Sequence, residues 1–217
     1  MKKTLLMLTM FTVTVLMADA QSTTSKADTL QSQMSNFQKI LGETNMAFKM
    51  PEGAVEIPIV KNAQMHYEYA VKFPDKNLEV RYSVAPLKKR MEEFREREKN
   101  KKPGENVQNP NASSAAISYA VALNIGGGKM DTTIKFGPFR PDAVKKEFGA
   151  DWGGTTLAKL HKSFGTDYTN CIMVTLHKND IADAYIFYMG DSRENLMKLF
   201  AELVSKNGVF YALTFKQ

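Results

Sequence analysis

The segment NCIMVTLHKNDIADAYIFYM, residues 170–189, predicts two paired β-strands. Asn179-Asp180 supplies a two-residue turn, and residues 181–189 form the returning strand. After Asp183 that strand is apolar on both faces, which is typical of a central strand. The first strand alternates two sets of side chains with the two-residue period of a strand: Cys171, Met173, Thr175 and His177 on one side, Ile172, Val174 and Leu176 on the other. We expect Thr175 and His177 on a solvent-facing side near the turn.

A second hairpin is predicted earlier in the chain. Residues 64–73 and 78–84 each alternate in side-chain character, and Pro74-Asp75-Lys76-Asn77 joins them as a turn. The pattern predicts an antiparallel pair with one face toward solvent and one toward the core. Residues 47–58 contain three breakers and are expected to be extended or looped: Pro51, Gly53 and Pro58.

Helical periodicity accounts for much of the remaining chain. Apolar residues at steps of three and four predict an amphipathic helix that Gly42 ends: Leu30, Met34, Phe37 and Leu41. A second helix is predicted to start at Pro86, with the apolar stripe Leu87, Met91 and Phe94. A third is predicted to start at Ser113 or Ser114, with Ile117, Val121 and Ile125 on one face. Two more are predicted, one over 141–148 and one from Asp191 or Ser192 to Asn207-Gly208. Strands are predicted at 130–136 and 209–215, and residues 155–164 fit either a strand or a helix.

Hairpins separated by helices indicate the α+β class, with an antiparallel or mixed β-sheet covered by helices and an extra N-terminal helix. We divide the chain into a signal peptide at 1–20, a polar leader and amphipathic helix at 21–46, and a single globular α+β domain at 47–217. A flexible loop is expected near 100–112, where Asn111-Ala112-Ser113 matches a glycosylation sequon.

The first twenty residues have the form of a secretory signal peptide. Lys2 and Lys3 precede an uncharged apolar run over 4–17, and Ala18-Asp19-Ala20 is an A-x-A cleavage site. The run is shorter than the roughly 20 apolar residues that span a bilayer. We therefore expect an exported protein, periplasmic or extracellular, cleaved after Ala20 and without a membrane span in the mature chain.

Composition narrows the possible partners. Removing residues 1–20 of 217 leaves 197 and changes the net charge from +6 to about +5, because Lys2, Lys3 and Asp19 are lost. Mild basicity outside the cytoplasm permits contact with acidic lipids, glycans or proteins, and the compartment argues against nucleic acid. Cys171 is the single cysteine, so no internal disulfide is possible.

No catalytic signature is found. The histidines His66, His161 and His177 are widely separated, no G-x-S-x-G elbow exists, and Gly126-Gly127-Gly128-Lys129 lacks the spacing of a phosphate loop. Cys171 lies among hydrophobic neighbours and is expected to be a buried apolar side chain. We expect no metal, no cofactor and no catalytic residue.

The candidate binding residues are Asp151, Trp152 and His177. Asp151-Trp152-Gly153-Gly154 carries the only tryptophan. Its ring could stack on a ligand or partner at the surface, or it could fill the core. The charged helix at 87–102 is the other candidate contact surface.

The layout resembles the PsbP/Mog1-like α/β/α sandwich group, including its exported bacterial members. The resemblance spans residues 47–216 and rests on Phe48-Lys49-Met50-Pro51-Glu52-Gly53, the paired hairpins and a late amphipathic helix before a final strand. It implies a non-enzymatic adaptor that acts by binding proteins, and it transfers no site residue.

Three functions are therefore kept. The first is an exported soluble binding or adaptor domain that contacts an envelope or secreted protein. The second is a periplasmic carrier of an apolar small ligand, which predicts a pocket between sheet and helices. The third is a hydrolase, which requires two or more of four residues to converge in one cleft: Asp151, His161, Cys171 and His177.

Overall fold

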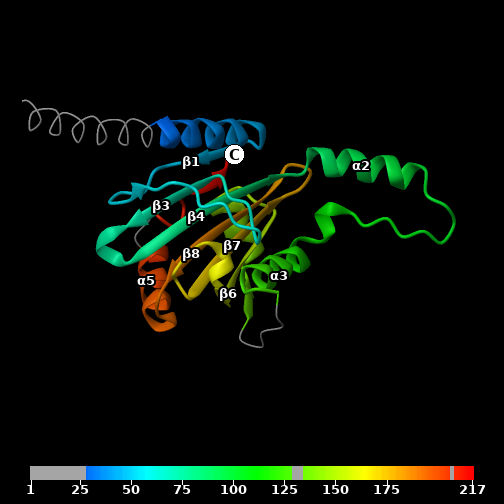
Figure 1. Cartoon of the computed structure of the whole chain (residues 1–217). Helices are drawn as coiled ribbons and strands as arrows, with labels where there is room; N and C mark the ends of the chain where they lie inside the picture. The colour runs from blue at the N-terminus through cyan, green and yellow to red at the C-terminus, as the bar shows by residue number, and fades with distance from the viewer. Residues whose placement is uncertain (1–27, 129–133, 206–207) are drawn as a thin grey trace, which may run out of the picture.

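A computed structural model describes residues 28–128, 134–205 and 208–217, and a seven-stranded sheet forms its middle layer (Figure 1). The strand order is β2-β3-β4-β8-β7-β6-β5, and every neighbouring pair is antiparallel. The strands are β2 (Val55–Glu56), β3 (Tyr69–Phe73), β4 (Leu78–Pro86), β5 (Lys135–Pro138), β6 (Trp152–Lys159), β7 (Asn170–Lys178) and β8 (Ala182–Gly190). The predicted α+β class is confirmed, and the sheet is antiparallel rather than mixed. The predicted signal peptide and the start of the leader lie outside the described residues.

Two strands form a separate small sheet. β1 (Met46–Phe48) pairs antiparallel with β9 (Leu213–Phe215). The strand predicted at 209–215 is thus shorter than expected, and it does not join the main sheet.

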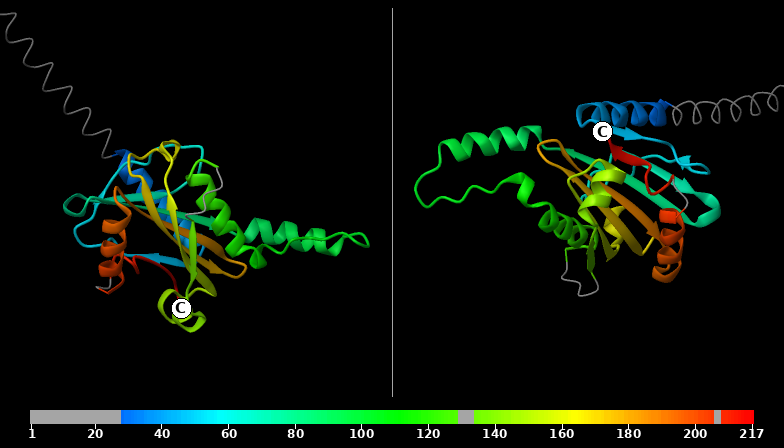
Figure 2. Two further views of the ribbon diagram at one scale, coloured as in Figure 1. Left: turned by 90° about the horizontal axis from the view of Figure 1, so that it is seen from below. Right: turned by 180° about the vertical axis from the view of Figure 1, so that it is seen from behind.

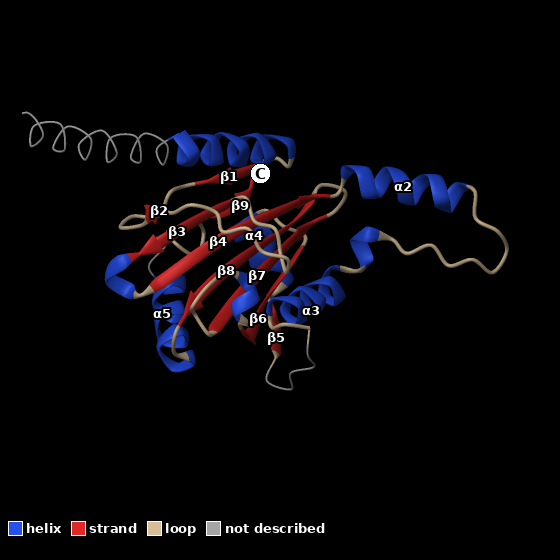
Figure 3. Ribbon diagram, viewed as in Figure 1, coloured by secondary structure: helices blue, strands red, loops and turns tan. Residues whose placement is uncertain are grey.

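Helices cover both faces of the main sheet (Figures 2 and 3). The helices are an N-terminal helix described from 28 to 43, α2 (Lys88–Lys99), α3 (Ser114–Ile125), α4 (Pro141–Phe148) and α5 (Arg193–Ser205), with short 3-10 helices η1 (Pro74–Lys76), η2 (Pro110–Ala112) and η3 (Lys162–Phe164). The N-terminal helix, α4, α5 and β9 share a core with one side of the sheet, here called the first face. α3 and η3 pack on the opposite side, the second face. No helix in the described ranges is long and apolar enough to cross a membrane.

The N-terminal helix is held to the first face by aromatic packing. The Phe37 ring stacks on Tyr69 with centroids 4.9 Å apart and meets Phe48 edge-on at 5.2 Å. Burying a side chain of this size contributes roughly 1.5–3 kcal/mol, so the predicted apolar stripe anchors this helix. The helix continues past Gly42 to residue 43, and Asn45, with φ of 51°, turns the chain into β1.

The second face carries a buried ion pair, and here the expected solvent-facing side of the hairpin at 64–84 is wrong. The segment around η3 covers β4 on this face, and Glu79, Arg81 and Ser83 are buried. The Arg81 guanidinium donates from Nε to Glu79 Oε1 at 2.7 Å, from Nη1 to the Phe164 carbonyl at 2.6 Å and from Nη2 to the Gly165 carbonyl at 2.7 Å. It also lies between the Tyr67 and Phe164 rings, 4.6 and 4.7 Å from their centroids. Polar residues that alternate in a strand therefore need not face water when buried partners satisfy them.

The first strand of that hairpin begins five residues later than predicted, at Tyr69. The Val84 backbone N–H donates to the Glu68 carboxylate at 2.8 Å, so a side chain takes the place of the next backbone partner. Burial raises the pKa of Glu68, and the hydrogen bond from Val84 lowers it in part. The ladder therefore ends where this carboxylate intervenes.

α3 packs closer to the sheet than its apolar residues suggest. Its buried row is Ser114, Ser118, Ala122 and Ile125, whereas Ile117 and Val121 are only half-buried. Ser118 Oγ lies 2.8 Å from Thr175 Oγ1 and 3.4 Å from Thr156 Oγ1. Small hydroxyl side chains thus face β6 and β7 because they allow both close approach and hydrogen bonding.

The structure assigns the ambiguous segment 155–164 and changes the bounds of the strand predicted at 130–136. Residues 155–159 of this segment belong to β6, and η3 occupies 162–164. The strand predicted at 130–136 lies partly outside the described residues, and β5 continues through Gly137 and Pro138, beyond the predicted end at residue 136. α4 ends at Gly149, with φ of 63°, as the sequence predicts.

Gly153 and Gly154 let aromatic rings lie directly on β6. A Cβ at Gly153 would be 2.9 Å from Val144 Cγ2 and 3.0 Å from the Thr175 carbonyl oxygen. A Cβ at Gly154 would be 3.0 Å from both the Gly137 oxygen and the Phe136 ring. Both glycines are therefore required by packing.

Replacing Gly153 with Ala is expected to destabilise the protein by about 1–3 kcal/mol, because an added methyl overpacks the α4–β6 contact. Gly42 is the matched control: it is helical, and a Cβ there would meet no atom within 4 Å. G42A should raise stability by roughly 0.5–1 kcal/mol through helix propensity. Urea unfolding of both variants measures the two changes, and equal effects of the same sign would contradict the packing argument.

Replacing Arg81 with Met should lower the free energy of unfolding by about 3–5 kcal/mol, because it leaves a buried carboxylate and two carbonyls without their donor. R140M, at the exposed Arg140, should change stability by no more than about 0.5 kcal/mol. Chemical denaturation provides the comparison, and a loss below about 1 kcal/mol for R81M would show that the buried pair is dispensable.

Candidate partner-binding site

The three candidate residues lie together at one end of β6 and β7. Trp152 is the register partner of His177. The Asp151 backbone N–H donates to the His177 carbonyl at 2.8 Å, and Asp151 Oδ2 accepts from the Asn179 N–H at 2.9 Å. The sequence thus named residues that are neighbours in space, although it did not predict how they contact one another.

His177 and Asp183 form a buried pair on the second face, so a solvent-facing position for Thr175 and His177 is wrong. His177 and Asp183 are each 1% exposed. His177 Nδ1 lies 2.7 Å from Asp183 Oδ1, and His177 Nε2 lies 3.1 Å from Asn179 Oδ1. Asp183 Oδ2, the second carboxylate oxygen, lies 3.9 Å from the charged Arg90 at Nη1.

Sequence reasoning missed Asp183 because of the turn length. The loop has three residues, 179–181, with Asp180 in the left-handed region at φ of 63°. This length pairs His177 with Asp183, whereas a two-residue turn would pair it with Ala182. An acidic residue in an otherwise apolar strand was the available signal.

The surroundings of His177 favour its charged form. Burial alone lowers the pKa of His177, but the hydrogen bond and charge of Asp183, together with Asn179 and Asp151, outweigh it and raise that pKa. Both ring nitrogens face oxygen atoms, which suits an imidazolium that donates twice. The ring is thereby held in place, with Nε2 against the side-chain oxygen of Asn179.

Trp152 is half-buried at the rim of the second face. Its ring stacks on Phe136, with centroids 5.7 Å apart and planes 9° from parallel, and Phe136 is 41% exposed. The tryptophan therefore neither fills the core nor stands free. The two rings form an aromatic surface beside the His177 pair.

The β7–β8 turn is also the attachment point of a projecting arm, which we define as residues 88–112. α2 and the loop after it extend away from the sheet and return at η2 (Figures 1 and 2). Asp180 Oδ1 lies 3.4 Å from Arg95 Nη2 and accepts from Asn111 Nδ2 at 3.1 Å, while the Asp180 N–H donates to Asn111 Oδ1 at 3.0 Å. The amide of the sequon residue Asn111 is thus engaged with the turn.

A groove lies at the base of the arm, between α2, η2 and α3. It has a volume of about 300 Å³. It is lined by Arg90, Glu93, Phe94, Arg97, Val107, Gln108, Pro110, Ser113 and Ile117. Arg90 therefore joins this groove to the buried His177–Asp183 pair.

The four residues considered for hydrolysis do not form one cluster. Asp151 and His177 are neighbours, but His161 follows the opposite end of β6, and Cys171 is paired with Ala158 near that end. Cys171 is a buried free thiol whose pKa is raised by burial, and the charge of Arg81 lowers it only in part. His66 is exposed and lies 3.3 Å from Glu68. Within the described ranges, no group of three or more His, Cys, Asp or Glu is placed to hold a metal ion.

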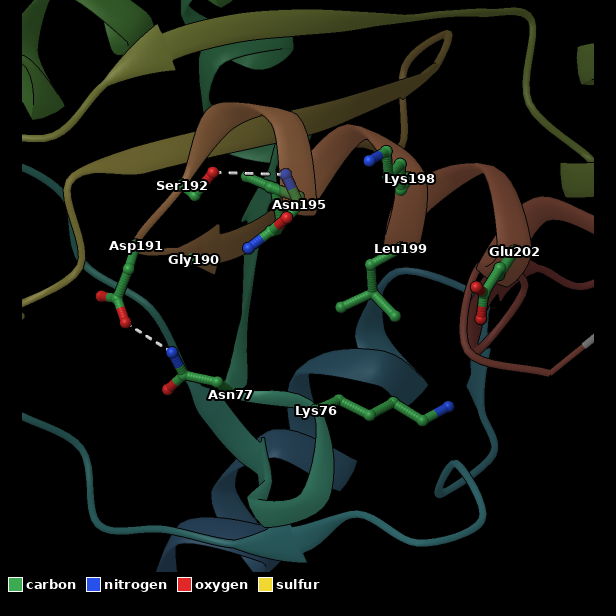
Figure 4. Close-up of a pocket in the computed structure, with 10 residues that line it drawn as sticks. Lys76, Asn77, Gly190, Asp191, Ser192, Asn195, Lys198, Leu199 and Glu202 are labelled. Atoms are coloured by element: carbon green, nitrogen blue, oxygen red, sulfur yellow. Dashed lines mark hydrogen bonds between the residues drawn. The ribbon is translucent and has the colours of Figure 1, made fainter.

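Two of the other hollows lie beside helices. One, of about 260 Å³, lies where α5 begins, and Figure 4 shows Asn77 directed toward Asp191 and Ser192 bonded to the Asn195 N–H. The other, of about 500 Å³, lies between the N-terminal helix and residues 59–67.

Comparison with known proteins identifies no relative: no family model matches the chain, and no curated protein matches it.

The pH dependence of stability should carry the signature of His177. A raised pKa in the folded state means that the protonated ring stabilises the fold fully below its unfolded pKa of about 6.5, and that this contribution is lost as pH rises through the folded value. The stability difference between wild type and H177Q should therefore be largest near pH 5.5 and shrink by pH 8. Unfolding curves across this range measure it.

H161Q is the control for removing a histidine ring: His161 is exposed and bonds to Ser163 instead of a carboxylate, so its loss breaks no buried ion pair. A constant difference between wild type and H177Q over the range would argue that the ring is neutral in the fold.

Proposed function

We propose that this protein is an exported, soluble binding or adaptor domain that acts in the cell envelope by contacting another protein. The observation that carries the proposal is the arm. α2 has twelve residues and buries only Met91, yet its base is fixed to the β7–β8 turn through Asp180. Isolated helices of this length are marginal in water, so an anchored helix with so little packing suits a surface that a partner completes.

The charge of the arm is mixed, which favours a protein partner. Lys89 and Glu93 are 3.9 Å apart and Arg97 and Glu105 are 3.8 Å apart, both at exposed positions. Such pairs contribute little to stability on their own. They do present both signs of charge, which provides orientation and specificity at a protein interface.

The leader sequence supports the compartment, and the layered arrangement supports a relationship to the PsbP/Mog1-like group. The proposed export depends on Lys2, Lys3 and the Ala18-Asp19-Ala20 site. Helices on both faces of the antiparallel sheet suit an α/β/α sandwich. The relationship remains a prediction.

A carrier of an apolar small ligand is the second candidate. The hollow beside the N-terminal helix favours it, because Ile59, Val60 and Tyr67 contribute to a space of about 500 Å³. That space lies at the rim of the molecule and not between the sheet and its helices, where a carrier pocket was predicted. Native mass spectrometry of protein purified from its host would detect a retained ligand.

The adaptor proposal is tested with the full chain, leader included, produced in a Gram-negative bacterium. A photo-crosslinking residue at Lys101, in the arm, should yield a discrete crosslink to an envelope protein, whereas the same residue at Lys39 on the N-terminal helix should not. The mature N-terminus, read by mass spectrometry, should be Gln21.

An A20K variant is the control for export and should keep its leader, because a bulky charged residue at the cleavage position blocks processing. Crosslinks that are equally strong from both positions, or an uncleaved wild-type chain in the cytoplasm, would contradict the proposal.

A further inference from the structure

We infer that the groove between α2, η2 and α3 binds an acidic segment of a protein partner, with one apolar side chain on its floor and carboxylates on Arg90 and Arg97. The inference rests on the proposed adaptor function and names the chemistry of the partner. Three features of the groove lead to it: its floor, its charge and the unused donors of its arginines.

Part of the groove floor is apolar, and the groove has room for part of a peptide. Val107 and Pro110 are buried, and Phe94 and Ile117 are half-buried. A volume of about 300 Å³ is at the lower end of the range of roughly 300–1,000 Å³ for small-molecule pockets. One side chain with its neighbouring backbone fits such a space better than a larger ligand does.

The charged wall of the groove is net basic. Arg90, Phe94 and Arg97 are spaced four and three residues apart, so they share one side of α2. Glu93 is also in the groove, but Lys89 lies 3.9 Å from it on the same helix. The opposite wall, residues 107–113, contains no charged residue. An incoming carboxylate therefore meets two guanidinium groups and no charged residue on the opposite wall, and it competes with Asp183, 3.9 Å from Arg90, and with Glu105, 3.8 Å from Arg97.

The two arginines keep their hydrogen-bonding capacity. Arg90 is 3.9 Å from Asp183, and Arg97 is 3.8 Å from Glu105. Both distances exceed those of hydrogen bonds, and within the described part of the chain neither guanidinium donates one. Because guanidinium binds carboxylate in a two-pronged geometry, each arginine can hold one acidic side chain of an extended segment.

The probe is a phage-displayed library of random twelve-residue peptides, selected on the mature protein. Selected peptides should carry at least two Asp or Glu around an apolar residue, and their binding should shift NMR resonances of the groove residues. R97Q should weaken the selected peptides at least tenfold, and R90Q/R97Q more. R97Q is the informative single variant, because Arg90 also lies against Asp183 and its loss alters the buried pair.

K88Q/K99Q is the matched control. It removes the same number of positive charges from the same helix, but at about 100° per residue these lysines point nearly opposite to Arg90 and Arg97. Peptide affinity should change less than twofold. An equal loss of peptide affinity in both double variants would mean that only the overall charge matters, and it would overturn the inference that the groove is the binding site.

Other outcomes also decide the question. Selection of peptides without acidic residues, shifts at another surface, no selection at all, or binding of vesicles containing anionic lipid in place of peptides would each overturn the inference. If the crosslink from Lys101 survives in R90Q/R97Q, the adaptor proposal stands while the groove is not its contact. If that crosslink is absent in the wild type, the adaptor proposal itself fails.

Discussion

The buried guanidinium of Arg81 determines how the second face of the sheet is closed. Among the described residues no α-helix covers β4 on that side; the segment around the 3-10 helix η3 does, and its carbonyl groups at Phe164 and Gly165 need donors once they are buried. Arg81 supplies these donors from the sheet itself, while Glu79 balances its charge and Tyr67 and Phe164 enclose it. An irregular segment can therefore serve as a core layer, because its backbone is satisfied by one planar cation.

A second polar cluster repeats this solution at the other end of the same face. His177 and Asp183 are buried at the rim, and their hydrogen bonds continue through Asn179 to Asp151. Between the two clusters, the hydroxyl groups of Ser118 and Thr175 join α3 to β7. The first face differs, because it is closed by aromatic and aliphatic packing among the N-terminal helix, α4 and α5. The two faces thus have different chemistry, and only the second is sensitive to the protonation of a histidine.

Periodicity in the sequence was sufficient for the class of the fold and for most elements, since strands and helices differ in period. It was not sufficient for burial. Glu79, Arg81 and Ser83 alternate as a solvent-facing strand would, and only the packing of the η3 segment over β4 shows that they are inside. The face of α3 was misjudged for a related reason, because hydrophobicity favours Ile117 whereas the close contact requires Ser118. For the candidate site, the pairing of β6 with β7 brings Asp151, Trp152 and His177 together, although the sequence offered them as separate candidates. The positions of Asp183 and Arg90 depend on strand register and on the path of the arm, which local sequence does not encode.

The length of the turn at residues 179–181 sets both the strand register and the attachment of the arm. Side chains in a strand alternate with a period of two, so a loop shorter by one residue would move the partner of His177 from Asp183 to Ala182 and leave the imidazole without its carboxylate. The same loop places Asp180 in a left-handed conformation, where its backbone and side chain both hold Asn111 and its carboxylate lies against Arg95. The length of this turn therefore determines both the buried His177–Asp183 pair and the attachment of the arm through Asp180. The candidate contact surface is positioned by the register of the two most buried strands of the sheet.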